Sequence, residues 1–251
     1  MRVGIIGGGR MGRWLRSEIS RVHEAAVFDV DPSRSEASSL GELVGRSDVL
    51  IVAVGFRDAG RVLEDLAKYD LCGKLVMDIA TFKKYVIGSY RALPDCALAA
   101  SVHPMFGPGA RSIKGRRVVV MEVPGRRGFR EAAEFFKGLG AEVVEGSVEE
   151  HDEYVKYTIA LSYAVGLALA RVYSKRGWDK LAKYGGTSFR YLSVFAASLL
   201  GDPSAPAYAE EAGEAVKELI DGLKESGAPA PPPGLENAYE LFYAALEALG
   251  Y

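Results

Sequence analysis

The feature that most constrains the fold is an alternation of short β-branched runs with amphipathic stretches over residues 1–146. Runs of this kind are typical of buried strands, and the stretches between them have the length of crossover helices. Strand, helix and strand in succession imply a right-handed, doubly wound parallel sheet. The expected strands are Arg2–Ile6, Ala25–Asp29, Asp48–Val54, Leu75–Ile79, Ala97–Val102, Val118–Val123 and Glu142–Val144, and the expected helices between them are Arg13–Val22, Ala59–Lys68 and Arg127–Leu139.

The pattern changes after Gly146, so we place a boundary there between a domain of residues 1–146 and a domain of residues 147–251. From Glu149 to Tyr173 the apolar residues follow a helical i, i+3, i+4 rhythm. The remainder reads as helical and ends in a helix at Glu236–Leu249, after a proline-rich connector. The chain is therefore expected to be an α/β protein, with an N-terminal Rossmann-like doubly wound sheet followed by an all-helical C-terminal dimerisation domain.

The dimer is expected because the segment Tyr157–Ala170 is apolar almost all round. A helix without a polar face must be buried on every side. A small helical domain cannot cover such a helix by itself, so two copies are expected to pack their helical domains together as a homodimer. Burial of the same helix against the N-terminal domain alone is the alternative.

Charge and composition exclude several classes of partner. Lys and Arg number 31 against 33 Asp and Glu, a net charge of −2, so neither nucleic acid nor an anionic membrane surface is expected. The longest uncharged apolar run, Tyr157–Ala170, has 14 residues, fewer than the ~18 that span a bilayer. No basic and apolar leader precedes Val3, which favours a cytoplasmic protein. Cys72 and Cys96 are accordingly expected to be reduced thiols, and no metal site is expected.

A Gly-x-Gly-x-x-Gly pattern lies between the first expected strand and the first expected helix. In this context Gly7 makes the tight turn, Gly9 lets a pyrophosphate approach the backbone, and Gly12 allows close packing of helix on strand. The amino end of the helix, with its positive dipole, would hold the phosphates. Arg10 and Met11 complete the expected cofactor-binding loop.

Asp29 ends the second expected strand, about 20 residues after the glycine loop, where a dinucleotide-binding domain carries an acid for the adenosine ribose. A carboxylate there repels a 2′-phosphate, so NAD is favoured over NADP. Arg10, Ser33 and Arg34 lie close in sequence and leave NADP open, because nearby cations accommodate a 2′-phosphate. The alternative is that the glycines form only a turn and Asp29 is a surface cap.

Open parallel sheets bind ligands beyond the carboxyl ends of their strands, and His103 directly follows one expected strand there. An imidazole with a pKa of ~6.5 is neutral at working pH and is a natural proton acceptor. Without further information, a histidine hydrogen-bonded in a turn explains the residue equally well. The chain has two other histidines, His23 and His151, and a position at a helix end explains His23.

Residues 101–108 read Ser-Val-His-Pro-Met-Phe-Gly-Pro, which resembles the signature of the prephenate and arogenate dehydrogenase family. The glycine loop is similar to the cofactor loop of that family. Other similar segments follow in the family's order: Asp78-Ile-Ala-Thr81-Phe-Lys83, Glu150-His151-Asp152, Thr187-Ser-Phe-Arg190 and Asp202-Pro203. Together they span about residues 2–210.

The resemblance implies an NAD-dependent oxidative decarboxylation of prephenate to 4-hydroxyphenylpyruvate, or of arogenate to tyrosine, with the substrate between the two domains. It implies that His103 is catalytic, that Thr81 lies beside it, and that Arg190 and His151 bind the substrate. The sequence departs from the family at two places. Thr81 replaces the usual serine, which keeps the hydroxyl but adds a methyl group near the ring. Ala160–Tyr163 lacks a histidine that many members carry, which leaves substrate choice and feedback control open.

Alternatives remain for these residues and for the function. One alternative is that Lys83 merely caps its loop and has no catalytic role. Another is that His151 begins a helix and does not contact the ligand. Arg190 lies in an apolar helix, where a buried guanidinium would need a salt bridge, with Asp152 or Asp179 as partner. The rival functions are another dehydrogenase, of the β-hydroxyacid dehydrogenase or pyrroline-carboxylate reductase type, and a non-catalytic dinucleotide sensor.

Overall fold

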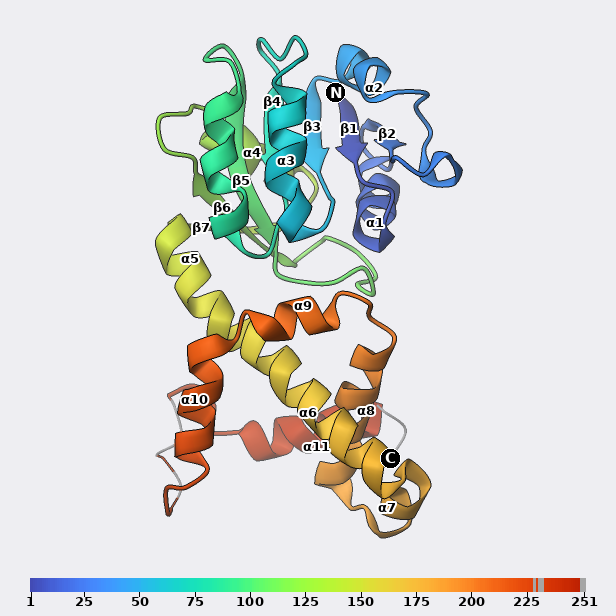
Figure 1. Ribbon diagram of the computed structural model, residues 1–251, viewed down its shortest axis with the longest axis vertical. Helices are drawn as coiled ribbons and strands as arrows, with labels where there is room; N and C mark the ends of the chain where they lie inside the picture. Colours follow the sequence, from blue (N-terminus) through green and yellow to red (C-terminus); the bar gives the residue numbers. More distant parts are fainter. Residues whose placement is uncertain (228, 230–232, 249–251) are drawn as a thin grey trace. The chain divides into compact units, whose positions relative to one another are not determined.

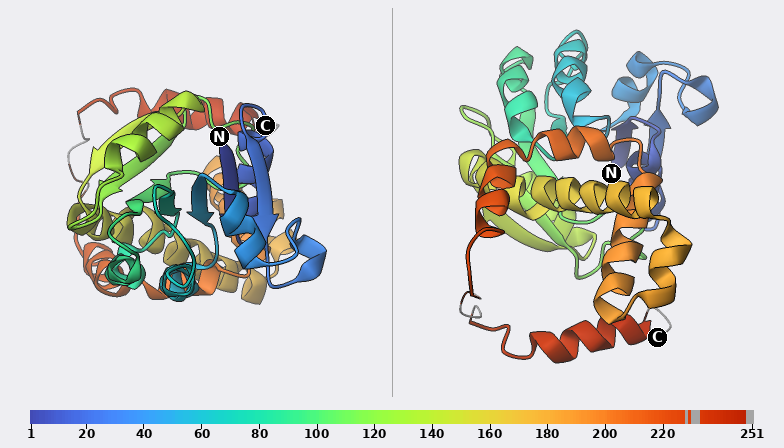
Figure 2. Two further views of the ribbon diagram at one scale, coloured as in Figure 1. Left: turned by 90° about the horizontal axis from the view of Figure 1, so that it is seen from above. Right: turned by 60° about the horizontal axis from the view of Figure 1, so that its bottom comes forward.

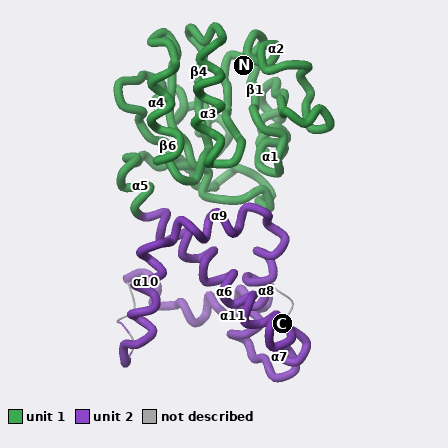
Figure 3. Tube along the Cα trace, in the orientation of Figure 1, with its two compact units in different colours: residues 1–153 green, residues 154–251 purple. Residues whose placement is uncertain are grey.

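The computed structural model of the protein describes residues 1–227, 229 and 233–248. It divides into two compact units, Met1–Glu153 and Tyr154–Tyr251 (Figure 3). The last strand of the first unit ends at Gly146, the residue at which the sequence pattern changes. The first helix after that strand begins at Val148, so His151 belongs to the same unit as the sheet.

Seven strands form one sheet in the order β2-β1-β3-β4-β5-β6-β7 (Figure 1). The first five are parallel, whereas β6 pairs antiparallel with β5 and β7 runs parallel to β6. The bounds are β1 Arg2–Ile6, β2 Glu24–Phe28, β3 Val49–Val52, β4 Leu75–Asp78, β5 Leu98–Pro104, β6 Arg117–Glu122 and β7 Glu142–Gly146. The Rossmann-like sheet expected from the sequence is confirmed.

Helices cover both faces of the sheet (Figure 2). On one face, Leu15 and Phe136 from two helices share a buried cluster with strand residues such as Ile51. The helices of this unit are α1 Arg10–Ile19, α2 Leu40–Arg46, α3 Phe56–Leu66 and α4 Phe129–Gly138, with short 3-10 turns η1 Pro32–Arg34, η2 Lys83–Tyr85 and η3 Ile87–Ala92. The sequence pattern missed α2, which is only seven residues long and begins where the Ser39 side chain accepts from Glu42 N.

The strand order reverses direction at β1, which is a topological switch point. From β1 the chain adds β2 on one side and then crosses to β3 on the other. Ligands of open α/β sheets bind at such a switch point, outside the carboxyl ends of the strands. The loop after β1 begins with Gly7, whose amide donates to Phe28 O. The fold therefore places the glycine-rich loop at this switch point.

The second unit is helical, as expected. A helical stretch from Val148 to Arg176 enters it, and within the unit α6 packs on α8 and α9 around Leu167, Leu199 and Ala205. The helices are α5 Val148–Val155, a π-turn at Lys156–Ala160 (η4), α6 Leu161–Arg176, α7 Trp178–Tyr184, α8 Thr187–Leu200, α9 Ala205–Glu210, α10 Gly213–Gly222 and α11 Ala238–Ala248. Leu249 and part of the proline-rich connector lie outside the described residues.

The helical stretch Val148–Arg176 bears on two expectations, the absence of a segment long enough to span a bilayer and the burial of this helix. It has 29 residues and, by length and composition only, is long and apolar enough to cross a membrane. The count of uncharged residues alone therefore underestimated the length of the apolar helix. Of its most apolar window, 28% is buried within the chain, so one chain does not bury this helix on every side. A core helix of a soluble assembly meets the same criterion, and the finding alone does not place the helix in a bilayer.

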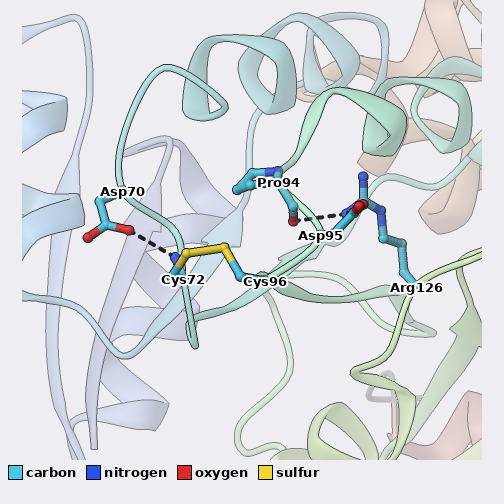
Figure 4. The surroundings of a disulfide bond; sticks show 6 residues. All are labelled: Asp70, Cys72, Pro94, Asp95, Cys96 and Arg126. Carbon is cyan, nitrogen blue, oxygen red and sulfur yellow. Dashed lines mark hydrogen bonds and ion pairs between the residues drawn. A yellow bond between two sulfur atoms is a disulfide. The ribbon is translucent and has the colours of Figure 1, made fainter.

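The two cysteines form a disulfide, so the expectation of reduced thiols is wrong. Cys72 and Cys96 precede β4 and β5, and their Cα atoms lie 4.7 Å apart (Figure 4). These strands are parallel neighbours, which brings the two preceding loops together, and Gly73 N donates to Cys96 O at 2.9 Å. The expectation rested on the redox compartment, whereas the sheet order decides the geometry.

Candidate functional site

The glycine loop has the shape that a dinucleotide requires. Gly7 has a φ of 113°, which favours glycine, and a Cβ on Gly12 would overlap Gly7 O. A Cβ on Gly9 would meet nothing within 4 Å, so the backbone there faces open space. The first helical hydrogen bond runs from Arg13 N to Gly9 O, which places the amino end of α1 at this opening. A pyrophosphate therefore fits beside Gly9.

Asp29 directly follows β2 and lies against the glycine loop. Its carboxylate accepts hydrogen bonds from Gly8 N and Asp31 N. Two groups that left NADP open are engaged nearby, because Arg34 pairs with Asp31 at 3.1 Å and the Ser33 hydroxyl donates to Asp31 at 2.7 Å. The Asp29 carboxylate thus lies beside the glycine loop, and Arg34, one of the two nearby cations, is paired with Asp31.

Helix α1 also holds the loop that follows β5. Trp14 Nε1 donates to Ala110 O at 2.7 Å, and the Trp14 ring lies edge-on to Phe106 with centroids 5.2 Å apart. One turn further on, the buried Glu18 carboxylate accepts from Ile113 N at 2.9 Å. The helix that starts at the glycine loop therefore fixes the segment after His103, which sequence reasoning did not anticipate.

His103 and His151 form a buried pair. His103 is the penultimate residue of β5, and its Nδ1 lies 2.9 Å from Nε2 of His151 on α5. The two rings are nearly perpendicular, with centroids 5.0 Å apart. They are 5% and 7% exposed, so neither is a solvent-facing side chain. His151 Nδ1 in turn lies 3.0 Å from Oδ1 of Asp152.

A second buried cluster lies beneath the same edge of the sheet. The Lys83 ammonium donates to Asp78 Oδ2 and to Val102 O, both at 2.7 Å, and both charged side chains are fully buried. The other oxygen of Asp78 accepts from the hydroxyls of Tyr90 and Ser101. Val102 is the residue before His103, so Lys83 anchors the backbone that carries the imidazole.

The electrostatic setting keeps His103 neutral and Asp152 charged. Burial, with Lys83 and His151 nearby, holds the pKa of His103 well below its usual value. Partial burial opposes ionisation of Asp152, but hydrogen bonds from His151 and from the amides of Lys83 and Lys84 lower its pKa. Burial lowers the pKa of Lys83, although Asp78 favours its charged form.

Burial also raises the pKa of Tyr90 well above its usual value, and Asp78 adds to this shift. The phenol therefore stays protonated and serves as a donor within the cluster. At neutral pH, His103 can consequently act as an acceptor, with Asp152 as a carboxylate and Tyr90 as a phenol nearby.

The remaining predicted residues fall in different places. Thr81 is 7% exposed and follows β4, whose Asp78 is in register with Ser101, so Thr81 and His103 lie at the same edge of the sheet. Arg190 lies on α8 in the other unit and is exposed, so the assumption that its guanidinium is buried is wrong. It lines a hollow of about 280 Å³ together with Trp178 and other residues.

Sequence reasoning singled out His103, His151 and Lys83 but missed how they connect. The sign available was an acid beside each basic group, because Asp152 follows His151 and Asp78 precedes Lys83 by five residues. Acids at these spacings are common, and only the fold shows that they are within hydrogen-bonding distance. Tyr90 carried no such sign.

Sequence comparisons agree with this architecture. Residues 2–81 match the family model described as NADP oxidoreductase, coenzyme F420-dependent. A protein of Methanocaldococcus jannaschii named probable arogenate/prephenate dehydrogenase is 25% identical over 187 residues, which cover 67% of this chain. The match spans 42% of that relative, so the chain corresponds to less than half of its length.

Solved structures show the same fold along the whole chain. A prephenate dehydrogenase from Aquifex aeolicus, in complex with hydroxyphenyl propionate and NAD+, has a TM-score of 0.70 and 18% identity, covering 100% of this chain and 96% of that one. An arogenate dehydrogenase from Synechocystis has a TM-score of 0.65 and 15% identity, covering 100% and 98%. In sequence and in fold the chain is thus similar to the prephenate and arogenate dehydrogenases, as the segment around His103 indicated.

Proposed function

We propose that the protein is an NAD-dependent dehydrogenase that oxidatively decarboxylates prephenate to 4-hydroxyphenylpyruvate, or arogenate to tyrosine. The observation that carries this proposal is the neutral, buried His103 within its Ser-Val-His-Pro-Met-Phe-Gly-Pro segment, in the same unit as a glycine loop open at Gly9. The loop supplies a place for the dinucleotide, and the histidine supplies an acceptor for the substrate.

The cofactor proposed is NAD. The Asp29 carboxylate beside the glycine loop disfavours a 2′-phosphate by charge repulsion. The pairing of Arg34 with Asp31 supports the same choice, because it engages one of the two nearby cations, Arg10 and Arg34, that would stabilise such a phosphate. Gly7, Gly9, Arg10, Met11 and Gly12 would form the pyrophosphate loop.

When bound, the nicotinamide would accept a hydride from the ring carbon that carries the substrate hydroxyl, as the ring carboxylate leaves as CO2. His103 would accept a hydrogen bond from that hydroxyl, and this bond strengthens as positive charge develops in the transition state. The proton stays with the product, which is a phenol. Thr81 would orient the hydroxyl or the imidazole, and Arg190 would hold a substrate carboxylate through a bidentate contact.

The assembly proposed is a homodimer that covers the helix around Tyr157–Ala170 with the same segment of a second copy. The incomplete burial of this helix within one chain supports the proposal. A cytoplasmic location remains a prediction from the sequence.

Initial rates with prephenate and arogenate, each combined with NAD and NADP, test the proposed function. We expect reduction of NAD with at least one of the two substrates and at least a tenfold preference for NAD over NADP, or about 1.4 kcal/mol. A tenfold preference for NADP would contradict the role of Asp29. If neither substrate reduces either dinucleotide, the reaction is wrong, and dinucleotide binding without turnover would favour a sensor.

A further inference from the structure

His103, His151 and Asp152 form a continuous chain of hydrogen bonds. His103 Nδ1 lies 2.9 Å from His151 Nε2, and His151 Nδ1 lies 3.0 Å from Asp152 Oδ1. Two of the three groups are adjacent on α5, whereas His103 comes from β5, 48 residues earlier. These hydrogen bonds thus link helix α5 to strand β5, which carries the predicted catalytic residue.

The protons in this chain can be assigned by elimination. Asp152 is an ionised carboxylate that also accepts from Lys83 N at 2.8 Å and Lys84 N at 2.7 Å, so it can only accept from His151. When the His151 ring carries one proton, that proton is on Nδ1, which leaves a lone pair on Nε2. In this arrangement His103 donates from Nδ1, and the lone pair of His103 is on Nε2.

Both ring nitrogens of His151 are engaged in this series of hydrogen bonds. One bonds His103 and the other bonds Asp152, so a neutral His151 has no polar atom left for a substrate. Among the described residues no buried side-chain nitrogen or oxygen lacks a partner. The second nitrogen of His103 has no protein partner there, so this atom is not fully covered, although the side chain as a whole is buried.

We propose that His151 is a positioning residue rather than a substrate contact. With Asp152 it holds His103 in the Nδ1–H tautomer and presents Nε2 as the acceptor. For catalysis this inference rests on the proposed function, because it is the substrate hydroxyl that Nε2 would meet. As that hydrogen bond strengthens, the positive charge drawn onto His103 is stabilised through His151 by the Asp152 carboxylate.

The loop after β4 supports the arrangement from both ends. The amides of Lys83 and Lys84 fix the Asp152 carboxylate, while the Lys83 ammonium binds Val102 O beside His103. One short segment therefore sets the distance between the acid and the strand. Lys83 and His151 are the titratable groups that act on His103, and both disfavour protonation of its ring, while Asp78 pairs with Lys83 and Asp152 bonds His151.

The tautomer can be measured without any assumption about the reaction. The chain has only three histidines, so ¹⁵N-histidine labelling gives three rings, with His23 as an internal reference. Long-range ¹H–¹⁵N spectra at neutral pH should show His103 with a protonated Nδ1 and an unprotonated Nε2. In His151→Leu this preference should be lost. A protonated Nε2 on His103 in the unaltered protein, or an unchanged tautomer in His151→Leu, would overturn the inference.

Kinetics of two His151 variants then test the catalytic consequence. His151→Leu removes the acceptor and should lower kcat about 10- to 100-fold with little change in KM, a smaller loss than for an acid–base group itself. His151→Gln keeps an oxygen that can accept from His103 Nδ1 and should recover most of the rate. A raised KM at unchanged kcat in both variants would instead assign His151 to substrate binding. Matching thermal midpoints exclude unfolding, and an unaltered protein inactive on both substrates would contradict the proposed function while leaving the tautomer result standing.

Discussion

The two units differ in how completely they bury their own apolar residues. In the first unit, α1 and α4 cover one face of the sheet with a continuous buried cluster. In the second, the buried cluster is Leu167, Leu199 and Ala205, whereas large apolar side chains such as Val172 and Leu200 are 54% and 59% exposed. The first unit, residues 1–153, covers its own apolar core, and we call it the closed unit. The second unit presents apolar surface that a soluble chain does not normally leave uncovered.

The chemistry follows the same division. The histidine pair and the Lys83–Asp78 ion pair lie within the closed unit, where burial lowers the pKa values of His103 and Lys83. The helical unit instead carries an exposed Arg190 beside a hollow. We expect changes in the first unit to alter turnover and unfolding, and changes in the second to alter binding and assembly.

The largest expected effect comes from removing the acceptor in the closed unit. His103→Asn lacks the Nε2 atom, so kcat should fall by roughly 10²–10⁴ while the affinity for NAD stays nearly unchanged. Arg190→Ala in the helical unit should mainly raise KM, because a carboxylate contact is present in ground and transition states alike. Steady-state kinetics of the two variants test this contrast, and exchanged phenotypes would mean that the two roles are reversed.

The pH dependence of turnover sharpens the same prediction. The pKa of His103 lies well below its usual value because the ring is buried near Lys83. Protonation removes the Nε2 acceptor, so kcat should remain constant as the pH falls through ~6.5 and decline only at lower pH. A decline centred near the ordinary histidine pKa would show that the ring is more hydrated than the structure indicates.

The sequence predicted the closed unit better than the site inside it. The strands were predictable because β-branched runs have a local pattern, and each observed strand end lies within two residues of the expected one. The contact between His103 and His151 could not be predicted in this way, because 48 residues separate them and only the fold brings them together. The burial of Arg190 was expected from its apolar neighbours in sequence, but α8 leaves that position exposed.

Loss of the buried ion pair should be the largest effect on stability. Lys83→Met leaves the Asp78 carboxylate buried without its cation and should lower the free energy of unfolding by about 3–5 kcal/mol. Lys68→Met is the matched control, since Lys68 pairs with Asp65 at 2.5 Å on the exposed surface and should cause no measurable change. Urea unfolding of both variants measures the difference, and equal midpoints would show that the buried pair does not stabilise the unit.

The disulfide should contribute slightly less. Cys72 and Cys96 are 24 residues apart in sequence. Without the cross-link the unfolded chain gains conformational entropy, which should lower the free energy of unfolding by about 3 kcal/mol. The double variant Cys72→Ser/Cys96→Ser should therefore unfold at lower urea concentration than the oxidised protein and match the reduced protein. Free-thiol titration under denaturing conditions provides the check, because two reactive thiols in the untreated protein would mean that the bond does not form.

The last prediction tests whether the helical unit is incomplete alone. Val172 on α6 and Val22 after α1 are similarly exposed, 54% and 59%, but lie in different units. If a second copy covers the helix, an aspartate at Val172 must be desolvated at the interface, so Val172→Asp should raise the dimer dissociation constant at least tenfold, or about 1.4 kcal/mol. Val22→Asp should leave it unchanged, because the closed unit needs no cover. Sedimentation or light scattering at micromolar concentration gives both values. If the unaltered protein is monomeric under these conditions, the prediction that a second copy covers the helix is wrong. If the monomer also binds lipid vesicles, the exposed helix contacts a bilayer instead of a partner.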